Sequence, residues 1–482
     1  MPAWLSSALS PWTTPAALFG AVVAVAALVG VRGRRLATLA AVVAAGLGLW
    51  QAWKIGPPSG LLDLKIYVHS ARGWLEGGSL YDYSDPVFHL SATYPPIGPL
   101  LFSVLSPLTM EAREVLWTAV SLASLAGCAG CAAVLAGVAP ERRRTWALWA
   151  FALAVTTIPA WLTLRLGQVN VVLWLLVLGD LVALTRRSRW AGVGIGLATS
   201  VKLVPGLFLV WLAVAGVHVV RRGPGPARRR LRLDHFGVAA VRGVATAAAV
   251  TIAGWAVAPD DSWRYWTGLM WDSHRVGLVD DDRNNSLLRV VADVVSPGQA
   301  RTATWLLLAA VVVVVALVRG RGAARRGDLL AVAVVVGCAS SLISPISWTH
   351  HLGFLVLALA ALSTVEAWWR WPAVAAGWLF LVDPGGLGDH PTTATIRVFV
   401  MIALVVAMPV VDGRTTGSAS DGAEEPLDEL PATAVDVVAA DRHAPDDLGA
   451  PLAHDVGELV EGLPGVEGVG AEHRASLPRH ER

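Results

Sequence analysis

Long apolar segments recur along most of this chain, and short polar gaps separate them. Several segments approach the roughly 20 residues that a helix needs to cross a lipid bilayer. The composition agrees, since 55% of the 482 residues are hydrophobic. The sequence therefore predicts an all-α, polytopic transmembrane helical bundle with about 11 to 13 membrane helices. A soluble fold is not expected.

Arginine clusters fall in short gaps between the apolar segments. They lie at residues 32–35, 142–144, 186–189, 221–232 and 319–326. Short cytoplasmic loops of membrane proteins carry an excess of Lys and Arg. These gaps are therefore predicted to face the cytoplasm and the gaps between them to face outward, with the N-terminus outside and the C-terminus inside.

This alternation assigns most apolar segments to membrane spans. The predicted spans lie near residues 15–31, 36–53, 113–138, 146–163, 171–185, 190–201, 203–220, 236–258, 300–318, 328–344, 352–366, 372–384 and 394–411. Residues 97–109 are predicted to form a re-entrant or broken helix, because a full crossing would place the cluster 142–144 outside. No basic region precedes the first apolar run, so no removable signal peptide is predicted.

The two short spans 190–201 and 203–220 are predicted to form a hairpin whose tip carries Lys202 on the outer side. A lysine buried near a membrane needs an anionic partner, which makes Lys202 a functional candidate. The alternative is that its amine snorkels to the interface. Lysine is scarce here, since the chain contains only Lys54, Lys65 and Lys202.

The predicted outer loops are long and polar. Residues 54–95 contain four of the chain's five tyrosines, and Ile66 to Leu75 has the spacing of an amphipathic interfacial helix. The tyrosines could instead form only an aromatic belt. The loop 259–299 contains the triplet Asp280 to Asp282, which could bind a divalent cation, although a solvated loop is the commoner explanation. No metal site is predicted there.

Four polar motifs lie at the outer ends of apolar segments and together predict an active site at a bilayer surface. They are residues 63–67, 167–170, 284–288 and 344–351. Asp63 could act as a general base towards an acceptor hydroxyl. Its alternative role is a helix cap or a loop hydrogen bond.

The other candidates suit a sugar and a phosphate. His350 and His351 could hydrogen-bond a phosphate, although interfacial histidines are often structural. Gln168 and Asn170 offer neutral donors and acceptors for sugar hydroxyls. Arg165 and Lys202 could neutralise phosphate oxygens.

The ordered set of motifs resembles glycosyltransferase family 87. The matching residues are Asp63 with Tyr67, Tyr94-Pro95-Pro96, Gly167-Gln168-Val169-Asn170, Gly196 with Lys202 and Pro205, Asn285-Ser286-Leu287, and Ser344 to Trp348 with His350 and His351. Members of this family are actinobacterial polyprenol-phosphate-mannose-dependent mannosyltransferases of the GT-C type. The resemblance spans roughly residues 36 to 411.

The resemblance implies a membrane hexosyltransferase with its active site on the outer, periplasmic-side face of the plasma membrane. It implies mannose transfer from polyprenyl phosphate mannose, by inversion, to a glycolipid or lipoglycan such as a phosphatidylinositol mannoside or lipomannan. The expected product is α-linked, with an α-1,2 linkage. No nucleotide sugar or other cofactor is expected, and a metal requirement stays doubtful.

The resemblance also implies roles for individual residues. Asp63 corresponds to the catalytic base, and His350 or His351 to the histidine near the donor phosphate. Lys202 and Arg165 become phosphate partners. The remaining positions expected to bind the donor phosphate or sugar are Gln168, Asn170, Asn285, Ser286, Tyr67 and Tyr94.

Two domains are predicted. Residues 1–411 form the membrane glycosyltransferase domain, and residues 412–482, with 16 acidic against 5 basic side chains, form a disordered cytoplasmic tail. Basic loops facing anionic lipid do not indicate nucleic-acid binding. The alternatives are a lipid or solute transporter, since an intramembrane lysine and broken helices also mark transport pathways, or a GT-C transferase that uses another lipid-phosphate sugar.

Overall fold

The computed structural model describes residues 33–54, 61–221, 229–272, 275–382 and 391–414. Almost all regular structure in this part of the chain is helical, so the all-α prediction is confirmed. The predicted span 15–31 and nearly all of the predicted tail lie outside the described residues.

In the described residues, thirteen helices correspond to apolar segments of the sequence. They are α2 (Arg34–Lys54), α5 (Met110–Leu135), α6 (Pro140–Val155), α7 (Ile158–Leu166), α8 (Asn170–Thr185), α9 (Val193–Val201), α10 (Gly206–Gly216), α11 (His235–Val257), α14 (Gln299–Arg325), α15 (Leu329–Ile343), α16 (Gly353–Ser363), α17 (Arg370–Val382) and α18 (Pro391–Ala407). Shorter elements connect them: α3 (Leu62–Leu75), α4 (Ile97–Leu100), η1 (Leu101–Leu105), α12 (Pro259–Thr267), η2 (Leu269–Trp271), α13 (Leu287–Ala292) and η4 (Thr349–His351).

Three of the described helices, α5, α11 and α14, are long and apolar enough to cross a membrane. The predicted span 146–163 is interrupted, because α6 and α7 meet at a bend of 73°. Pro159 lies in the first turn of α7 and cannot continue a helix from α6, since it lacks an N–H and its ring clashes with the preceding turn. The pair is a broken span or a re-entrant loop.

The segment 97–109 is a short α-helix, α4, followed by a 3-10 turn, η1, so the predicted broken helix is confirmed. The predicted span 203–220 is too long. Helix α10 ends at Gly216, and β1 (Val217–Arg221) pairs antiparallel with β2 (Arg229–Leu233). The valine-rich sequence of β1 favours a strand. The β1–β2 hairpin was not predicted.

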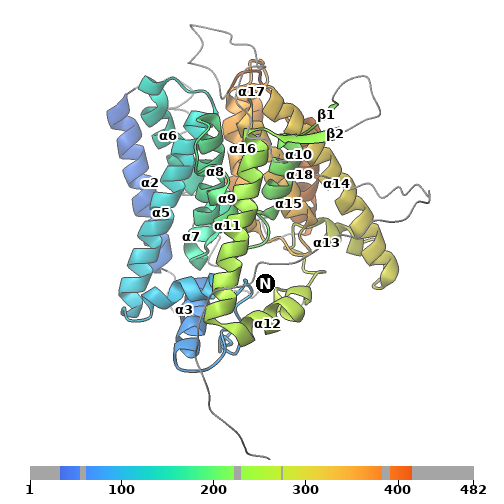
Figure 1. Ribbon diagram of the computed structural model, residues 1–482. Helices are drawn as coiled ribbons and strands as arrows, with labels where there is room; N and C mark the ends of the chain where they lie inside the picture. The colour runs from blue at the N-terminus through green and yellow to red at the C-terminus, as the bar shows by residue number, and fades with distance from the viewer. Residues whose placement is uncertain (1–32, 55–60, 222–228, 273–274, 383–390, 415–482) are drawn as a thin grey trace, which may run out of the picture. The chain divides into compact units, whose positions relative to one another are not determined.

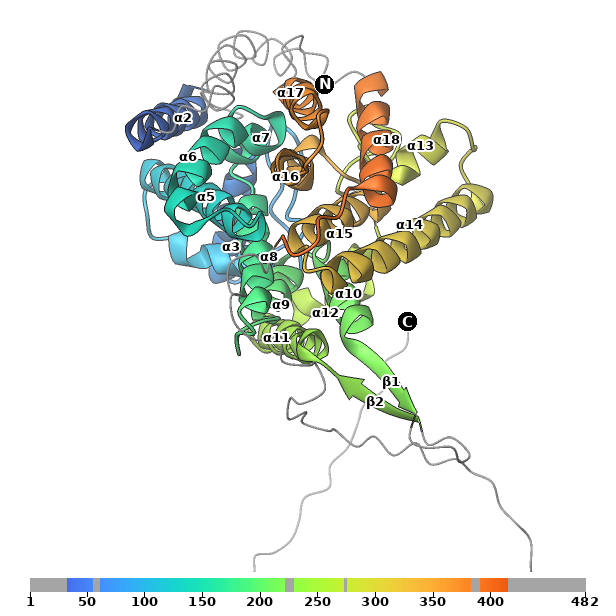
Figure 2. The same cartoon turned by 90° about the horizontal axis from the view of Figure 1, so that it is seen from above.

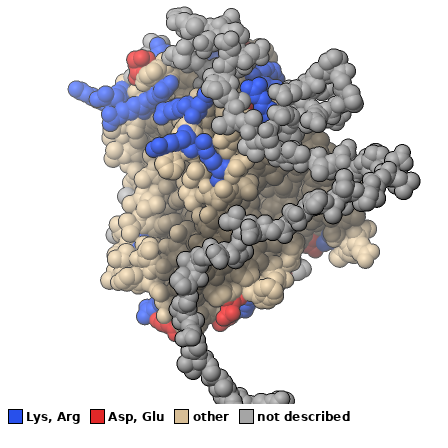
Figure 3. Space-filling view, in the orientation of Figure 1, with Lys and Arg blue, Asp and Glu red and all other residues tan. Residues whose placement is uncertain are grey.

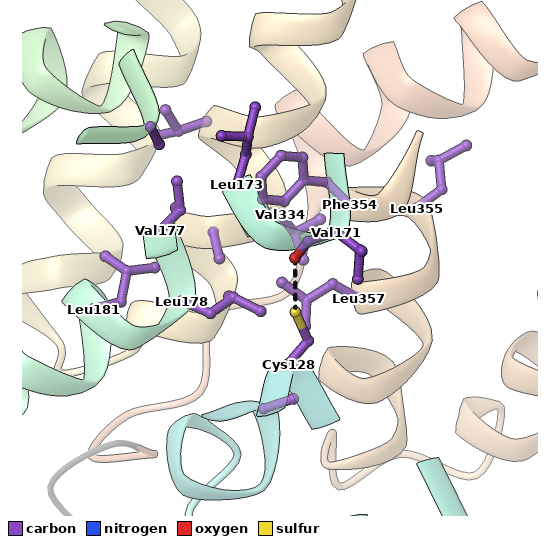
Figure 4. Close-up of a cluster of buried hydrophobic side chains, with 14 of the residues drawn as sticks. Cys128, Val171, Leu173, Val177, Leu178, Leu181, Val334, Phe354, Leu355 and Leu357 are labelled. Atoms are coloured by element: carbon purple, nitrogen blue, oxygen red, sulfur yellow. Dashed lines mark hydrogen bonds between the residues drawn. The ribbon is translucent and has the colours of Figure 1, made fainter. Parts of the chain in front are cut away.

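The core is built around α15, whose residues from Leu329 to Leu342 are all buried. Figure 2 shows α15 between α14 and the helices α16 and α8, with α18 packed alongside. Figure 4 shows the neighbouring cluster, where the Cys128 thiol of α5 lies 3.7 Å from the Val171 carbonyl of α8. Helix α15 packs on α16 and α8, whose first residues adjoin His351 and include Asn170.

Basic side chains gather at one end of the molecule, around α6 (Figures 1 and 3). Helices α3 and α12 lie at the opposite end (Figure 1). Exposed arginines near the basic end include Arg142, Arg144, Arg186, Arg187 and Arg189. The structure thus separates the arginines at the start of α6 and after α8 from the element that carries Asp63.

Gly192 provides a test of the packing that fixes α9. Its φ of 100° is a backbone conformation that residues other than glycine rarely adopt. An added Cβ would also collide with the Ala239 carbonyl of α11. We expect Gly192→Ala to destabilise the protein by about 1–3 kcal/mol, measured as a lower thermal unfolding midpoint in detergent. Gly130→Ala in α5 is the control, because nothing lies within 4 Å of its added Cβ. Equal midpoints for the two variants would contradict the prediction.

Candidate active site

A polar cluster forms where the ends of several elements meet. Asp63 and Tyr67 come from α3, Tyr94 precedes α4, Gln168 and Asn170 flank the start of α8, Lys202 follows α9, and His351 ends η4. Three of the four polar motifs of the sequence therefore contribute side chains to one network. The contacts divide it into a carboxylate half around Asp63 and a cation half around Lys202.

Asp63 lies in the first turn of α3 and is partly buried. A carboxylate is favourable there because the N-terminus of a helix carries partial positive charge. The N-cap residue is Leu61, which has no side-chain cap hydrogen bond. Asp63 therefore does not cap the helix, and its Oδ2 instead accepts a hydrogen bond of 2.7 Å from Gln168 Nε2. The helix-cap alternative is therefore wrong, whereas the alternative of a hydrogen bond with a loop is met by the bond from Gln168.

The turn between α7 and α8 is packed directly on α3. Gly167 has a φ of 66°, and a Cβ there would lie 2.8 Å from the Leu64 Cβ. Its carbonyl accepts a hydrogen bond of 2.8 Å from Trp117 Nε1, and Gln168 N donates to the Thr163 carbonyl over 3.0 Å. Glycine is needed because only glycine combines this conformation with so close an approach.

The carboxylate half contains two buried tyrosines. Gln168 Oε1 accepts from the Tyr94 hydroxyl at 2.8 Å and from the Tyr67 hydroxyl at 3.3 Å. The two hydroxyls are 3.1 Å apart. Because both tyrosines are buried in this network, they do not belong to a surface aromatic belt.

The cation half surrounds the Lys202 amine. Nζ donates to Asn170 Oδ1 over 2.9 Å, lies 3.4 Å from the Tyr94 hydroxyl and lies 3.0 Å from His351 Nε2. The amine is thus held inside the cluster, and the snorkelling alternative is wrong. Asn170 in turn donates from Nδ2 to the His350 carbonyl over 3.0 Å, which joins η4 to α8.

The hydrogen bonds of His351 determine which ring nitrogen carries its proton. Nδ1 accepts from the Trp348 backbone N–H at 3.1 Å, so a neutral ring is protonated at Nε2. That N–H faces Lys202 Nζ, and a protonated Lys202 would place two donors against each other. An anion at this point would accept from both.

Burial shifts the titration of both charged residues, which lie outside the membrane-spanning helices. It raises the pKa of Asp63 to about 6, against the lowering effect of the Gln168 hydrogen bond and of Lys202. It lowers the pKa of Lys202 to about 7, against the raising effect of Asp63. Burial also lowers the pKa of His351 well below its ordinary value, which keeps the ring neutral. Both Asp63 and Lys202 can therefore change charge near neutral pH.

The remaining predicted residues lie around this network. Asn285 and Ser286 attach their segment to the loop that leads to η4: Asn285 N donates to the Ser347 carbonyl over 2.7 Å, and Ser286 Oγ donates to the Pro345 carbonyl over 2.9 Å. Ser286 also caps α13. These contacts give both residues a structural role beside the predicted binding role.

Arg165 and His350 are buried next to the network. The Arg165 guanidinium lies over the Trp161 ring at 5.2 Å, and its carbonyl accepts from Leu61 N at the start of α3. His350 contributes its carbonyl to Asn170, while its ring packs at 4.5 Å against the ring of His351. The structure thus singles out His351 as the histidine whose ring faces Lys202.

Arg397 of α18 was not predicted to take part. It is buried, and its Nη1 donates to Thr349 Oγ1 over 3.3 Å, beneath η4. The signal was present in the sequence, because an arginine within an apolar membrane segment is costly and marks a functional or structural polar contact.

The acidic triplet of the loop 259–299 pairs with arginines. The pairs are Asp280–Arg301 at 3.0 Å, Asp281–Arg283 at 2.6 Å and Asp282–Arg289 at 3.6 Å. Among the described residues, no three His, Cys, Asp or Glu side chains are arranged to hold a metal ion. These carboxylates therefore have a structural explanation.

A narrow cavity of about 30 Å³ opens beside the cation half. Its polar end is formed by Asn170, Lys202 and His351. Its other walls come from the helices α8, α10, α15 and α16 and from the residues before α10, and they are mainly apolar: Leu173, Trp174, Val177, Val204, Pro205, Phe208 and Phe354, with Ser340 and Ser341. A cavity of this size holds about one or two water molecules, and its polar end groups side chains that can bind an anion.

Comparison with known proteins identifies the same family as the motifs. The model of glycosyltransferase family 87 matches residues 92–345. The chain is 30% identical, over 72% of its length and 81% of the relative, to a polyprenol-phosphate-mannose-dependent alpha-(1-2)-phosphatidylinositol mannoside mannosyltransferase of Mycobacterium tuberculosis strain H37Rv.

Two further relatives carry a related name, polyprenol-phosphate-mannose-dependent alpha-(1-2)-phosphatidylinositol pentamannoside mannosyltransferase. One, from M. tuberculosis strain CDC 1551, is 31% identical over 73% of this chain and 77% of its own length. The other, from Mycolicibacterium smegmatis, is 31% identical over 63% of this chain and 70% of its own length. The family match includes Tyr94, Gln168, Asn170 and Lys202 but lies between Asp63 and His351.

Proposed function

We propose a specific reaction for this chain, which belongs to glycosyltransferase family 87 and is a membrane glycosyltransferase. It transfers mannose from polyprenyl phosphate mannose to a hydroxyl group of a phosphatidylinositol mannoside, forming an α-1,2 linkage. The names of the relatives support the donor, the acceptor class and the linkage. Family membership also argues against the transporter alternative.

The observation that carries this proposal is that one turn, between α7 and α8, contacts both a carboxylate and a cation. Gln168 binds Asp63, and Asn170, two residues later, binds Lys202. A glycosyl transfer from a lipid phosphate needs a base at the incoming hydroxyl and positive charge at the leaving phosphate. The network supplies one group for each task.

The polar end of the small cavity supports a donor with an anionic leaving group. Its polar end offers the Lys202 amine, the Asn170 amide and the His351 Nε2–H, while most of its walls are apolar. A phosphate at the polar end would relieve the opposition of the two donors Lys202 and His351.

The proposed step inverts the anomeric carbon. The acceptor oxygen attacks that carbon while its proton passes to the Asp63 carboxylate. The bond from the carbon to the phosphate oxygen breaks, and its electron pair leaves with the phosphate. Lys202 and His351 stabilise the negative charge of the departing phosphate. No cofactor takes part in this proposed step.

The proposal places the site on the outer face of the plasma membrane, the arginine clusters in the cytoplasm, and the tail 412–482 also in the cytoplasm. A multi-pass arrangement follows from the alternation of arginine-rich and polar gaps. The separation of α3 from the basic end of the molecule supports this orientation.

Asp63→Asn tests the base. We expect turnover to fall by about 10²-fold or more, because the amide cannot accept the acceptor proton. The measurement is transfer of radiolabelled mannose from polyprenyl phosphate mannose to phosphatidylinositol mannosides in membranes containing verified amounts of protein. Asp82→Asn is the control, since this carboxylate is exposed and pairs with Arg264. Near-normal turnover of Asp63→Asn would remove Asp63 from the mechanism.

His350→Ala and His351→Ala test donor binding. Both should weaken use of the donor more than use of the acceptor. The effect of His351→Ala should be larger, about 10- to 100-fold in the KM for the donor, because it removes a hydrogen bond to a charged group. Steady-state kinetics with each substrate varied separately measures both constants. An unchanged donor KM in His351→Ala would give this histidine a purely structural role.

The pH dependence of kcat/KM tests both halves together. Asp63 must be ionised, so activity should rise as the pH increases through about 6. Lys202 must be protonated, so activity should fall as the pH increases through about 7. We expect a bell-shaped profile with its maximum between these values. A rate that stays constant from pH 5 to 8 would contradict these assignments.

A further inference from the structure

We propose that Gln168 is a positioning residue for the base: it holds one carboxylate oxygen of Asp63 so that the other faces the acceptor hydroxyl. This inference rests on the proposed function, because it concerns the same transfer. It also replaces a simpler expectation, that the Gln168 amide binds sugar hydroxyls. Both ends of this amide are already engaged by protein groups.

The orientation of the amide is fixed by its partners. Its oxygen accepts from the hydroxyls of Tyr94 and Tyr67, which have hydrogens to donate. Rotating the amide by 180° would place its NH₂ group against the tyrosines and its oxygen against a carboxylate. Nε2 must therefore face Asp63.

The position of the amide is fixed by the backbone that carries it. Gly167 lies against Leu64, one residue after Asp63, and Trp117 holds the Gly167 carbonyl. Gln168 N is bonded to Thr163. The base and the residue that holds it thus belong to two elements, α3 and the α7–α8 turn, that pack on each other.

The hydrogen bond makes the two oxygens of the Asp63 carboxylate inequivalent. Oδ2 accepts from Gln168 Nε2 at 2.7 Å. Among the residues that the structure describes, none donates a hydrogen bond to Oδ1. Oδ1 therefore keeps its lone pairs for the acceptor, and it is the atom that takes the proton when the acceptor oxygen bonds to the sugar carbon.

The environment of Asp63 makes the Gln168 hydrogen bond important for the ionisation of this carboxyl group. Lys202 at the end of α9 favours the carboxylate, while burial opposes it. Tyr67 of α3 and Tyr94 before α4 are the neighbouring phenols, and Arg165 is the charged residue of the packed helix α7. The elements α4 and η1 carry no titratable side chain. A hydrogen bond to the charged form of an acid favours that form.

Gln168→Met is the first test, because methionine matches the length of glutamine and can donate no hydrogen bond. Without the bond, ionised Asp63 is less favoured, so the acidic limb of the pH–rate profile should move upward by about one to two pH units. The rate of the variant relative to the wild type should therefore be about 10- to 100-fold lower well below pH 6 and should recover as the pH rises from about 6 to 8. A purely structural defect would lower that ratio equally at every pH.

Gln168→Glu is the second variant, in case the methionine variant fails to fold. Its carboxyl can still accept from Tyr94, but a second carboxylate beside Asp63 would repel it and raise the pKa of the base in the same direction. A relative rate that is independent of pH in the folded variants would overturn the inference.

A double variant gives an independent readout. If Gln168 acts through Asp63, adding Gln168→Met to Asp63→Asn should change the residual rate by less than about twofold, because the two residues act as a unit. Full additivity would overturn the positioning role. The wild type separates the two proposals: absence of mannose transfer by the wild type would reject the proposed function, whereas transfer with unshifted Gln168 variants would reject this inference alone.

Discussion

Opposite charges at Asp63 and Lys202 are held by two amides of one short turn, and the rest of the site depends on this arrangement. Burial disfavours the charged form of each group, and each helps to stabilise the other. An unpaired charge in this setting would be neutralised by a change in protonation. Gln168 and Asn170 provide the polar contacts that hold the two groups in place.

The helices contribute by fixing where this turn lies. Gly167 brings it against α3, and the buried α15 supports the helices around it. The segment 284–286 attaches to the loop before η4 and thereby helps to place His351. Polar residues that do not reach the reacting groups therefore still affect the site, because they determine where its histidine lies.

The sequence predicted the helices, because apolar segments recur along the chain. It also indicated the charged residues that are costly to bury. Apolar length predicted the helices, the polar motifs at helix ends indicated Asp63, and the tip of the short pair 190–220 indicated Lys202. It did not predict the pairing of Gln168 with Asp63, since these residues are far apart in the chain and meet only through packing. It also treated Arg397 as part of a span, although its charge was a signal. The β1–β2 hairpin was missed because a short valine-rich run can equally continue a helix.

The spacing of the Gln168 and Asn170 amides also bears on the stereochemistry of the proposed transfer. In an inverting transfer, the acceptor oxygen and the leaving oxygen lie on opposite sides of the anomeric carbon. A base and a phosphate site carried by separate mobile loops would lose this alignment easily, and a displacement of about 1 Å can cost roughly 10²-fold in rate. Gln168 and Asn170 lie two residues apart in a segment packed against α3, so this one segment contacts both Asp63 and Lys202. In the proposed mechanism, the α7–α8 turn therefore supports both the base and the cation at the leaving phosphate.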